Sequence, residues 1–395
     1  MQVSRLLNSL HSPTVLVCAD YEDRTDRSDA TLQSDSNNSV LKCLRVPFEF
    51  STWHRMLARV SSRLSLPIAH KTPDAYTSWG ARVTESVADV ISQGQRFDLM
   101  VTFGAPMSDH LIGLKLKKRF GLPWVAHFSD PWVDNPFTSS DPLTNAVNRS
   151  LESKVLSVAD RVIFTSQETI DLVFRKYPAV LKTKARVLPH AFDERLFVNA
   201  ENARESKITI RYLGDFYGPR TPKPLFEALR QLRELNPSLL TNLHFELIGN
   251  FARQASGTGI LEDLPADLVS VKSPVGYLES LSLMSSSDGL LVIDAPAANS
   301  VFLPSKLIDY IGSKRPIFGI SPSGTAAKLI GELGGWVADP GDPIAVREQL
   351  SAFIQFLRQA RTERDTSWGR TEVRERFEIS AVSRMFSEIV EEVDS

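Results

Sequence analysis

Residues 97–132 read FDLMVTFGAPMSDHLIGLKLKKRFGLPWVAHFSDPW and contain one complete β-α-β pattern. The apolar run over 97–103 predicts a buried strand. The helical spacing of apolar residues over 109–120 predicts an amphipathic helix with lysines on its opposite face. Gly121 and Pro123 end this helix before a second apolar strand begins. Because two parallel strands need a crossover of this kind, the stretch predicts a parallel sheet covered by helices.

The same alternation of strand and helix continues toward the C-terminus. Further strands are predicted over 160–165, 185–189, 208–213, 243–248, 289–293 and 316–320, and helices near 166–176, 223–234, 278–286, 304–313, 343–357 and 378–393. The polar stretch 190–206 has no periodicity and predicts a linker. A chain of 395 residues also exceeds what one hydrophobic core usually supports. We therefore expect two α/β domains, 1–195 and 206–375.

The composition and net charge of the chain indicate which classes of binding partner to expect. The net charge is -2, from 45 basic and 47 acidic residues, so we expect no nucleic-acid partner. A basic cluster at 115–119 lies on a predicted helix. A solvated face is the favoured interpretation, and contact with an anionic membrane surface is the alternative. No signal peptide or membrane-spanning run is visible, which predicts a cytoplasmic protein, either free or docked on the inner face of the membrane.

Several motifs that would indicate other functions are missing from the sequence. No GxGxxG follows a first strand, and neither a Walker A loop nor a GxSxG elbow occurs. These gaps disfavour a dinucleotide dehydrogenase, a P-loop enzyme and an α/β-hydrolase. Neither an Asp-x-Asp pair nor a zinc-spaced Cys/His cluster is present, so we expect no metal site.

The loop 214–223 is the first candidate for a binding role. It leaves a predicted strand at Gly214 and enters a helix, and ligands of open α/β sheets bind beyond the carboxyl ends of strands. Glycine permits close approach of the backbone, while Arg220 and Lys223 supply a planar and a flexible cation that suit a diphosphate. The alternative is a helix-entry turn with two solvated cations.

The start of the predicted helix 304–313 is the second candidate. Pro304 suits a first helical turn, and the free N–H groups of Ser305 and Lys306 would then point at an anion. Lys306 and Asp309 share one helix face, so Asp309 would accept hydrogen bonds from a diol such as ribose. The alternative is an ordinary Lys–Asp pair at the surface, which contributes little.

The third candidate is Asp130, which follows the predicted strand 124–128. A carboxylate at this position would orient an acceptor hydroxyl or act as a base. The alternative is that Asp130 caps the following turn. For His127, on the strand itself, a satisfied core histidine and a catalytic group are both open interpretations.

Together these stretches resemble the family 4 glycosyltransferases of bacterial cell-surface polysaccharide synthesis, which have the GT-B fold. The resemblance runs from about residue 12 to the end, and its carrying segments are 97–106, 123–132, 159–166, 187–193, 212–220, 287–293 and 304–316. It implies two Rossmann-like domains with parallel sheets facing a central cleft, and a final helical segment, 376–395, that returns to the first domain. It also implies metal-independent, retaining transfer from a nucleotide diphosphate-sugar to a saccharide or lipid-linked acceptor hydroxyl, with no other cofactor.

The resemblance assigns roles to the candidate residues. Arg220, with Lys223 or Lys306, would hold the diphosphate and stabilise its departure, Asp309 would hold the ribose, and Asp130 would lie near the acceptor. The sequence departs from the family at Val301, where a glutamate normally stands eight positions before the ribose-binding acid. Two alternatives follow, a nucleotide-sugar epimerase and a non-catalytic partner that keeps the fold.

A second departure concerns the N-terminus. Members of the family open with a strand and a Gly-rich loop, whereas Thr14–Cys18 resembles their second strand and Met1–Leu10 resembles the end of their first helix. We therefore expect the first strand and its loop to be missing from this sequence, through a misplaced start or true loss.

Overall fold

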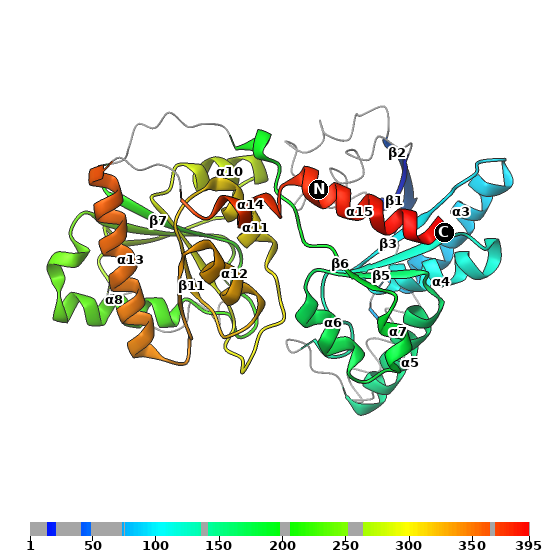
Figure 1. Cartoon of the computed structure of the whole chain (residues 1–395), viewed down its shortest axis with the longest axis horizontal. Coiled ribbons are helices and arrows are strands. Elements are labelled where there is room, and N and C mark those ends of the chain that lie inside the picture. The colour runs from blue at the N-terminus through cyan, green and yellow to red at the C-terminus, as the bar shows by residue number, and fades with distance from the viewer. Residues whose placement is uncertain are drawn as a thin grey trace.

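The computed structural model describes residues 14–20, 41–48, 73–74, 76–135, 141–197, 206–251, 264–363 and 368–394. It consists of two α/β bodies that lie side by side, each built around a parallel sheet (Figure 1). We call them the N-terminal body and the C-terminal body. The parallel sheets predicted from the sequence are confirmed. The expectation about Met1–Leu10 falls outside the described residues.

The N-terminal body is built on a four-stranded sheet in the order β3-β4-β5-β6. Its strands are β3 (Met100–Gly104), β4 (Trp124–Phe128), β5 (Arg161–Phe164) and β6 (Ala185–Val187), and its connecting helices are α4 (Ser108–Phe120), α5 (Pro142–Val158), α6 (Gln167–Phe174) and α7 (Ala179–Lys182). A separate parallel pair, β1 (Thr14–Asp20) and β2 (Leu41–Pro47), packs against α3 (Trp79–Ser92) and α4. The unit β3-α4-β4 is the one predicted from residues 97–132.

The N-terminal sheet is buried on both faces, as parallel sheets require. All five residues of β4 are buried. One face packs against the helices α4, α5 and α6. The other face is covered by the last helix, α15 (Ile379–Asp394), whose Val382, Phe386 and Ile389 share an apolar cluster with Val125 and Ile163. The C-terminal helix therefore lies on the N-terminal body (Figure 1).

The C-terminal body is built on a six-stranded sheet in the order β12-β11-β10-β7-β8-β9. Its strands are β7 (Ile208–Leu213), β8 (Leu243–Ile248), β9 (Val269–Lys272), β10 (Gly289–Ile293), β11 (Ile317–Ile320) and β12 (Trp336–Ala338). Helices α8 (Lys223–Leu235) and α13 (Pro343–Glu363) cover one face. The other face is covered by α10 (Tyr277–Ser285), α11 (Ser305–Ser313) and α12 (Thr325–Leu333), and the short α14 (Thr371–Glu375) leads back toward α15.

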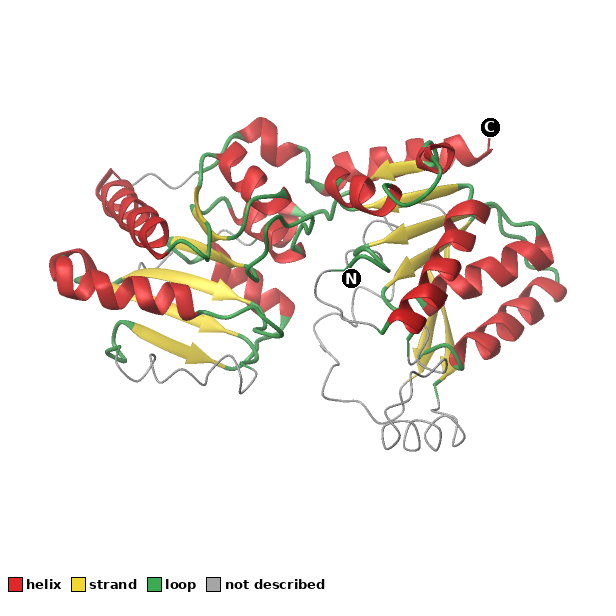
Figure 2. Ribbon diagram, turned by 90° about the horizontal axis from the view of Figure 1, so that it is seen from below, coloured by secondary structure: helices red, strands yellow, loops and turns green. Residues whose placement is uncertain are grey.

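The strand order places a ligand crevice between the two bodies. The first strand of the C-terminal body, β7, lies between β8 and β10, so the connections leave it in opposite directions and open a crevice at its carboxyl end. In both sheets the strands point toward the other body (Figure 2). The carboxyl ends of the two sheets therefore face each other. No helix in the described part of the chain has the length and apolar character needed to cross a membrane.

The packing of α15 generates a stability prediction. Phe386 is fully buried against the N-terminal sheet. We expect Phe386→Ala to destabilise the protein by about 3–5 kcal/mol, because the truncation loses apolar burial and leaves a cavity. Glu388→Ala, at an exposed position of the same helix, is the control and should change little. Urea unfolding measures both variants, and equal losses would contradict the proposed packing.

Candidate active site between the two sheets

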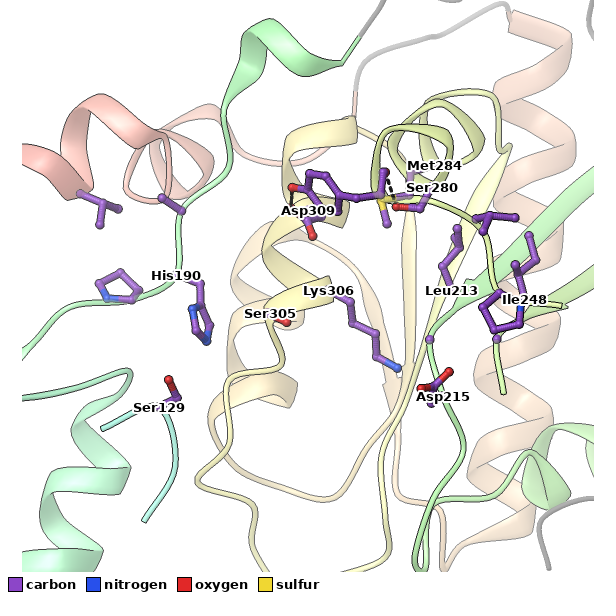
Figure 3. A pocket seen from close by; sticks show the side chains of 18 of the residues that line it. Ser129, His190, Leu213, Asp215, Ile248, Ser280, Met284, Ser305, Lys306 and Asp309 are labelled. Carbon is purple, nitrogen blue, oxygen red and sulfur yellow. Dashed lines mark hydrogen bonds between the residues drawn. The ribbon is translucent and has the colours of Figure 1, made fainter. Parts of the chain in front are cut away.

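A pocket of about 730 Å³ lies where the two bodies face each other. The N-terminal body lines it with residues at the ends of β3, β4 and β6, including His127, Ser129 and His190. The C-terminal body contributes the larger part, from the loops after β7, β8 and β9 and from two helices, α10 and α11 (Figure 3). The pocket therefore occupies the crevice expected from the strand order.

Two glycines bring the backbone close to this pocket. Gly214 follows β7 with a φ of 145°, and Gly249 follows β8 with a φ of 152°. A Cβ atom on Gly249 would lie 2.1 Å from the carbonyl oxygen of Gly214, so only glycine fits there. The predicted Gly214 loop thus lines the pocket with bare backbone.

Lys306 carries the main positive group of the pocket. Its Nζ donates to the hydroxyl of Tyr212 at 2.7 Å and lies 3.9 Å from the centre of that ring. Burial lowers the pKa of Lys306 well below its usual range, and the charge of Arg220 lowers the pKa further. No carboxylate of the described residues lies within ion-pair distance of Nζ. A bound anion would supply the missing counter-charge and favour the ammonium form.

Arg220 forms an ion pair with Asp294, an acid that the sequence analysis did not single out. Its Nη2 donates to Oδ1 of Asp294 at 3.2 Å, and Oδ2 of Asp294 accepts from Ser321. The guanidinium also lies 4.8 Å from the ring centre of Tyr217. Arg220 is not among the residues that line the pocket. Asp294 partly neutralises the charge of Arg220. The remaining electrostatic effect of Arg220 reaches the pocket without direct contact.

Lys223 is not brought together with the other candidates. It begins α8, and its side chain is half exposed, with the carboxylate of Glu227 at 3.6 Å. It does not line the pocket. This placement agrees with the alternative interpretation of a solvated cation at a helix entry.

The start of α11 does bring its candidates together. Pro304 is the N-cap, one residue before the helix, where a first-turn position was predicted. Ser305, Lys306 and Asp309 all line the pocket from this one helix (Figure 3). The N–H groups of Ser305 and Lys306, at the start of the helix, have no intrahelical partner, and the helix dipole makes this end positive.

The carboxylate of Asp309 is fixed one turn further along α11. It is 6% exposed, and its Oδ1 accepts a hydrogen bond from the hydroxyl of Tyr277 at 2.9 Å. Tyr277 begins α10 and lines the same pocket. A buried, oriented acceptor of this kind suits a ligand that carries hydroxyl groups.

Asp130 lies on the opposite side, beyond the end of β4. Burial raises the pKa of its carboxyl, whereas the charge of Arg220, from the other body, lowers it. No hydrogen bond or ion pair joins this carboxylate to the described residues, so the predicted alternative of a turn cap is not observed. Asp130 itself is not among the pocket-lining residues, although its neighbour Ser129 is.

Two histidines complete the N-terminal wall. Burial lowers the pKa of His127 to about 3, helped by the charge of His190, and burial lowers the pKa of His190 to about 4. Both rings are therefore neutral near pH 7. Nδ1 of His127 is buried without a hydrogen-bond partner in the described residues. His127 therefore lines the pocket with a ring nitrogen that has no partner in the described residues.

Several residues in or beside the pocket were not singled out from the sequence. Asp294 follows the apolar strand β10 directly, the same signal that singled out Gly214, and could have been found on that basis. Tyr277 and His190 carry no such signal, because only the fold brings them to the pocket. In the described ranges, no group of three or more His, Cys, Asp or Glu side chains could hold a metal ion.

Part of the chain matches a known family of proteins. Residues 1–191 match the family described as "Glycosyl transferase 4-like domain". No match was found among proteins of curated function.

Solved structures match over nearly the whole chain. Anabaena HepE in complex with UDP and glucose shares 12% identity with a TM-score of 0.66, over 99% of this chain and 95% of its own. Sucrose-phosphate synthase from Thermosynechococcus elongatus shares 14% identity with a TM-score of 0.71, over 100% and 92%. The E. coli trehalose-6-phosphate protein bound with UDP-2-fluoro glucose shares 11% identity with a TM-score of 0.68, over 98% and 95%. These likenesses confirm the predicted GT-B fold.

The buried histidines generate a prediction about pH. In the unfolded chain a histidine has a pKa of about 6.5, above the folded values. The unfolded chain therefore takes up protons first, and stability that is fully present above pH 6.5 is lost as the pH falls. We expect the melting temperature of His127→Gln to fall less between pH 7 and pH 5 than that of the wild type.

The control is Thr84→Val, which removes a buried hydroxyl but no titratable group. It should keep the pH dependence of the wild type. An unchanged pH dependence in His127→Gln would show that folding does not lower the pKa of His127.

Proposed function

We infer that this chain, whose residues 1–191 match the glycosyl transferase 4-like family, transfers a sugar from a nucleotide diphosphate-sugar to a hydroxyl of a saccharide or lipid-linked acceptor. One observation carries the proposal. A single helix, α11, presents free N–H groups, the cation of Lys306 and the buried carboxylate of Asp309 to one pocket. In a bound nucleotide diphosphate, the phosphates would contact the N–H groups and Lys306. The ribose hydroxyls would donate to Asp309.

The donor would bind mainly to the C-terminal body. Its diphosphate would lie at the start of α11, against Ser305, Lys306 and the bare backbone of Gly214. Negative charge grows on the leaving diphosphate during transfer, and preorganised donors at this point stabilise it. Arg220, held by Asp294, would add positive potential from nearby. The HepE and E. coli structures, which contain UDP or a UDP-sugar, support a UDP-sugar as the donor.

These positive groups also support transfer without a metal. Lys306, the helix terminus and Arg220 would together neutralise the diphosphate, the role a divalent cation has in other transferases. We propose metal-independent transfer with retention at the anomeric carbon, as the family resemblance implies. Lys223 has no place in this proposal, because it is half exposed outside the pocket.

The acceptor would enter from the N-terminal body. Asp130 has a carboxylate with no partner in the described residues, and its raised pKa suits a group that exchanges a proton with a hydroxyl. The neutral rings of His127 and His190 would offer hydrogen bonds without adding charge. A lipid-linked acceptor would bring the enzyme to the inner face of the membrane, where the exposed Lys115 and Lys118 would meet anionic lipids.

A ligand-dependent change in melting temperature tests the donor site. With UDP at a hundred times its dissociation constant, the folded state gains about 2.7 kcal/mol, which raises the melting temperature by several degrees. We expect this rise in the wild type and its loss in Lys306→Ala and Asp309→Ala. Lys223→Ala, a cation removed outside the pocket, is the matched control and should keep the rise.

The same experiment separates the alternatives. A wild-type protein that responds to neither UDP, GDP nor dTDP would contradict the proposed donor site. Binding without any turnover, in the presence of acceptors, would instead favour the non-catalytic partner protein. Interconversion of the sugar without an acceptor would favour the epimerase.

A further inference from the structure

The two bodies also meet through a buried polar contact away from the linker. The carbonyl oxygen of Val301, in the C-terminal body, lies 2.9 Å from Oγ of Ser166 and 3.1 Å from Oγ1 of Thr169. Both hydroxyls belong to the start of α6 in the N-terminal body, which faces α12 (Figure 1). Oγ1 of Thr325, at the start of α12, donates to the same carbonyl oxygen at 3.1 Å.

In this contact the N-terminal body supplies the hydrogen-bond donors and the C-terminal body supplies the acceptor. Ser166 is the N-cap of α6, and its Oγ accepts from the N–H of Thr169 at 3.1 Å. Oγ of Ser166 also lies 2.9 Å from Oγ1 of Thr169, and either hydroxyl can be the donor between them. Because a carbonyl oxygen can only accept, the contact with Val301 uses a hydroxyl proton of this Ser166–Thr169 pair. Ser166 and Thr169 are 4% and 1% exposed. Hydroxyls that are buried so fully need partners, and the other body supplies the acceptor.

The C-terminal side of the contact is held rigidly. Ser300 donates its N–H to the carbonyl of Ser323 at 2.8 Å, and its own carbonyl accepts from the N–H of Thr325 at 2.9 Å. Gly324 lies between them with a φ of 140°, and a Cβ atom there would be 1.9 Å from the carbonyl oxygen of Ser300. The carbonyl of Val301 is thus presented by a fixed loop.

An ion pair lies beside these hydrogen bonds. Nζ of Lys328, on α12, is 2.7 Å from Oε1 of Glu168 on α6. Lys328 is largely exposed, so the pair contributes little to stability by itself. The pair links α12 to α6, and the attraction between its two charges favours close contact between the two bodies.

The contact is connected directly to the donor side of the pocket. From Val301 the chain passes through Phe302 and the buried Leu303 to Pro304, the N-cap of α11. We propose that Ser166 and Thr169 of the N-terminal body, with the Val301 carbonyl, form a closing latch. The latch holds the bodies together and sets the start of α11 opposite the N-terminal wall of the pocket.

The catalytic consequence rests on the proposed function, whereas closure itself does not. Ser166 and Thr169 are positioning residues, because they lie outside the pocket and act through Val301 and α11. An opened latch would leave the donor site of the C-terminal body intact. It would, however, move the acceptor side away from the donor, and small displacements of reacting groups cost large factors in rate. It would also admit water to the donor sugar.

The test uses the double variant Ser166→Asp/Thr169→Val in the full chain. Aspartate remains a good N-cap but has no proton for the Val301 carbonyl and repels it, and valine removes the second hydroxyl at nearly constant volume. Thr84→Val is the matched control, because Thr84 is equally buried and donates to Gly80 within its own body. Circular dichroism and melting temperature check that both variants fold.

Two measurements are then compared with the wild type, namely the radius of gyration from small-angle X-ray scattering and the kinetics of transfer from UDP-sugars. We expect a larger radius in the double variant, a transfer kcat lower by about tenfold or more, faster donor hydrolysis relative to transfer, and a Kd for UDP within about threefold. Thr84→Val should match the wild type throughout.

An unchanged radius of gyration in the folded double variant would overturn the latch. A larger radius with unchanged kcat would overturn its positioning role. If the wild type neither binds UDP nor transfers sugar, the proposed function fails, and the scattering comparison still decides whether the latch exists.

Discussion

The burial of α15 against the N-terminal sheet is the interaction on which the site depends. The chain reaches the C-terminal body by Phe192, which packs in the apolar cluster of that body, and later returns to cover β4 and β5 with Val382, Phe386 and Ile389. Glu392 of the same helix pairs with Arg161 and Arg186 of that sheet at 2.8 Å and 2.6 Å. The chain thus passes between the two bodies twice, once on the way to β7 and once on the way back to α15. These two connections keep the carboxyl ends of the strands facing each other across one pocket.

The three candidate cations differ in whether a carboxylate lies beside them. Arg220 has Asp294 as its partner, and Lys223 has Glu227 nearby. Among the described residues, the hydrogen-bond partner of the Lys306 amine is the Tyr212 hydroxyl, and the buried position disfavours the charged form of the amine. An anion that binds there would meet the positive end of a helix and would favour the charged form of Lys306, whereas Arg220 and Lys223 already have carboxylates beside them. This asymmetry explains why α11, and not α8, is the centre of the proposed donor site.

Much of the fold was predictable because its signals are local. The β-α-β pattern of residues 97–132 is complete within the stretch itself, and Ser305, Lys306 and Asp309 lie within two turns of one helix. The pairs that orient the site join distant positions, since Tyr277 is 32 residues from Asp309 and Arg220 is 74 residues from Asp294. No periodicity reveals such pairs. The edge strand β9 was also missed, because its last two residues are exposed and it lacks a continuous apolar run.

A crystal structure of the protein with UDP tests the central claim most directly. The account predicts that the diphosphate oxygens lie within hydrogen-bond distance of the N–H groups of Ser305 and Lys306 and of the Lys306 Nζ, with the ribose hydroxyls on Asp309. Density for UDP at another place on the protein, with the start of α11 unoccupied, would contradict it.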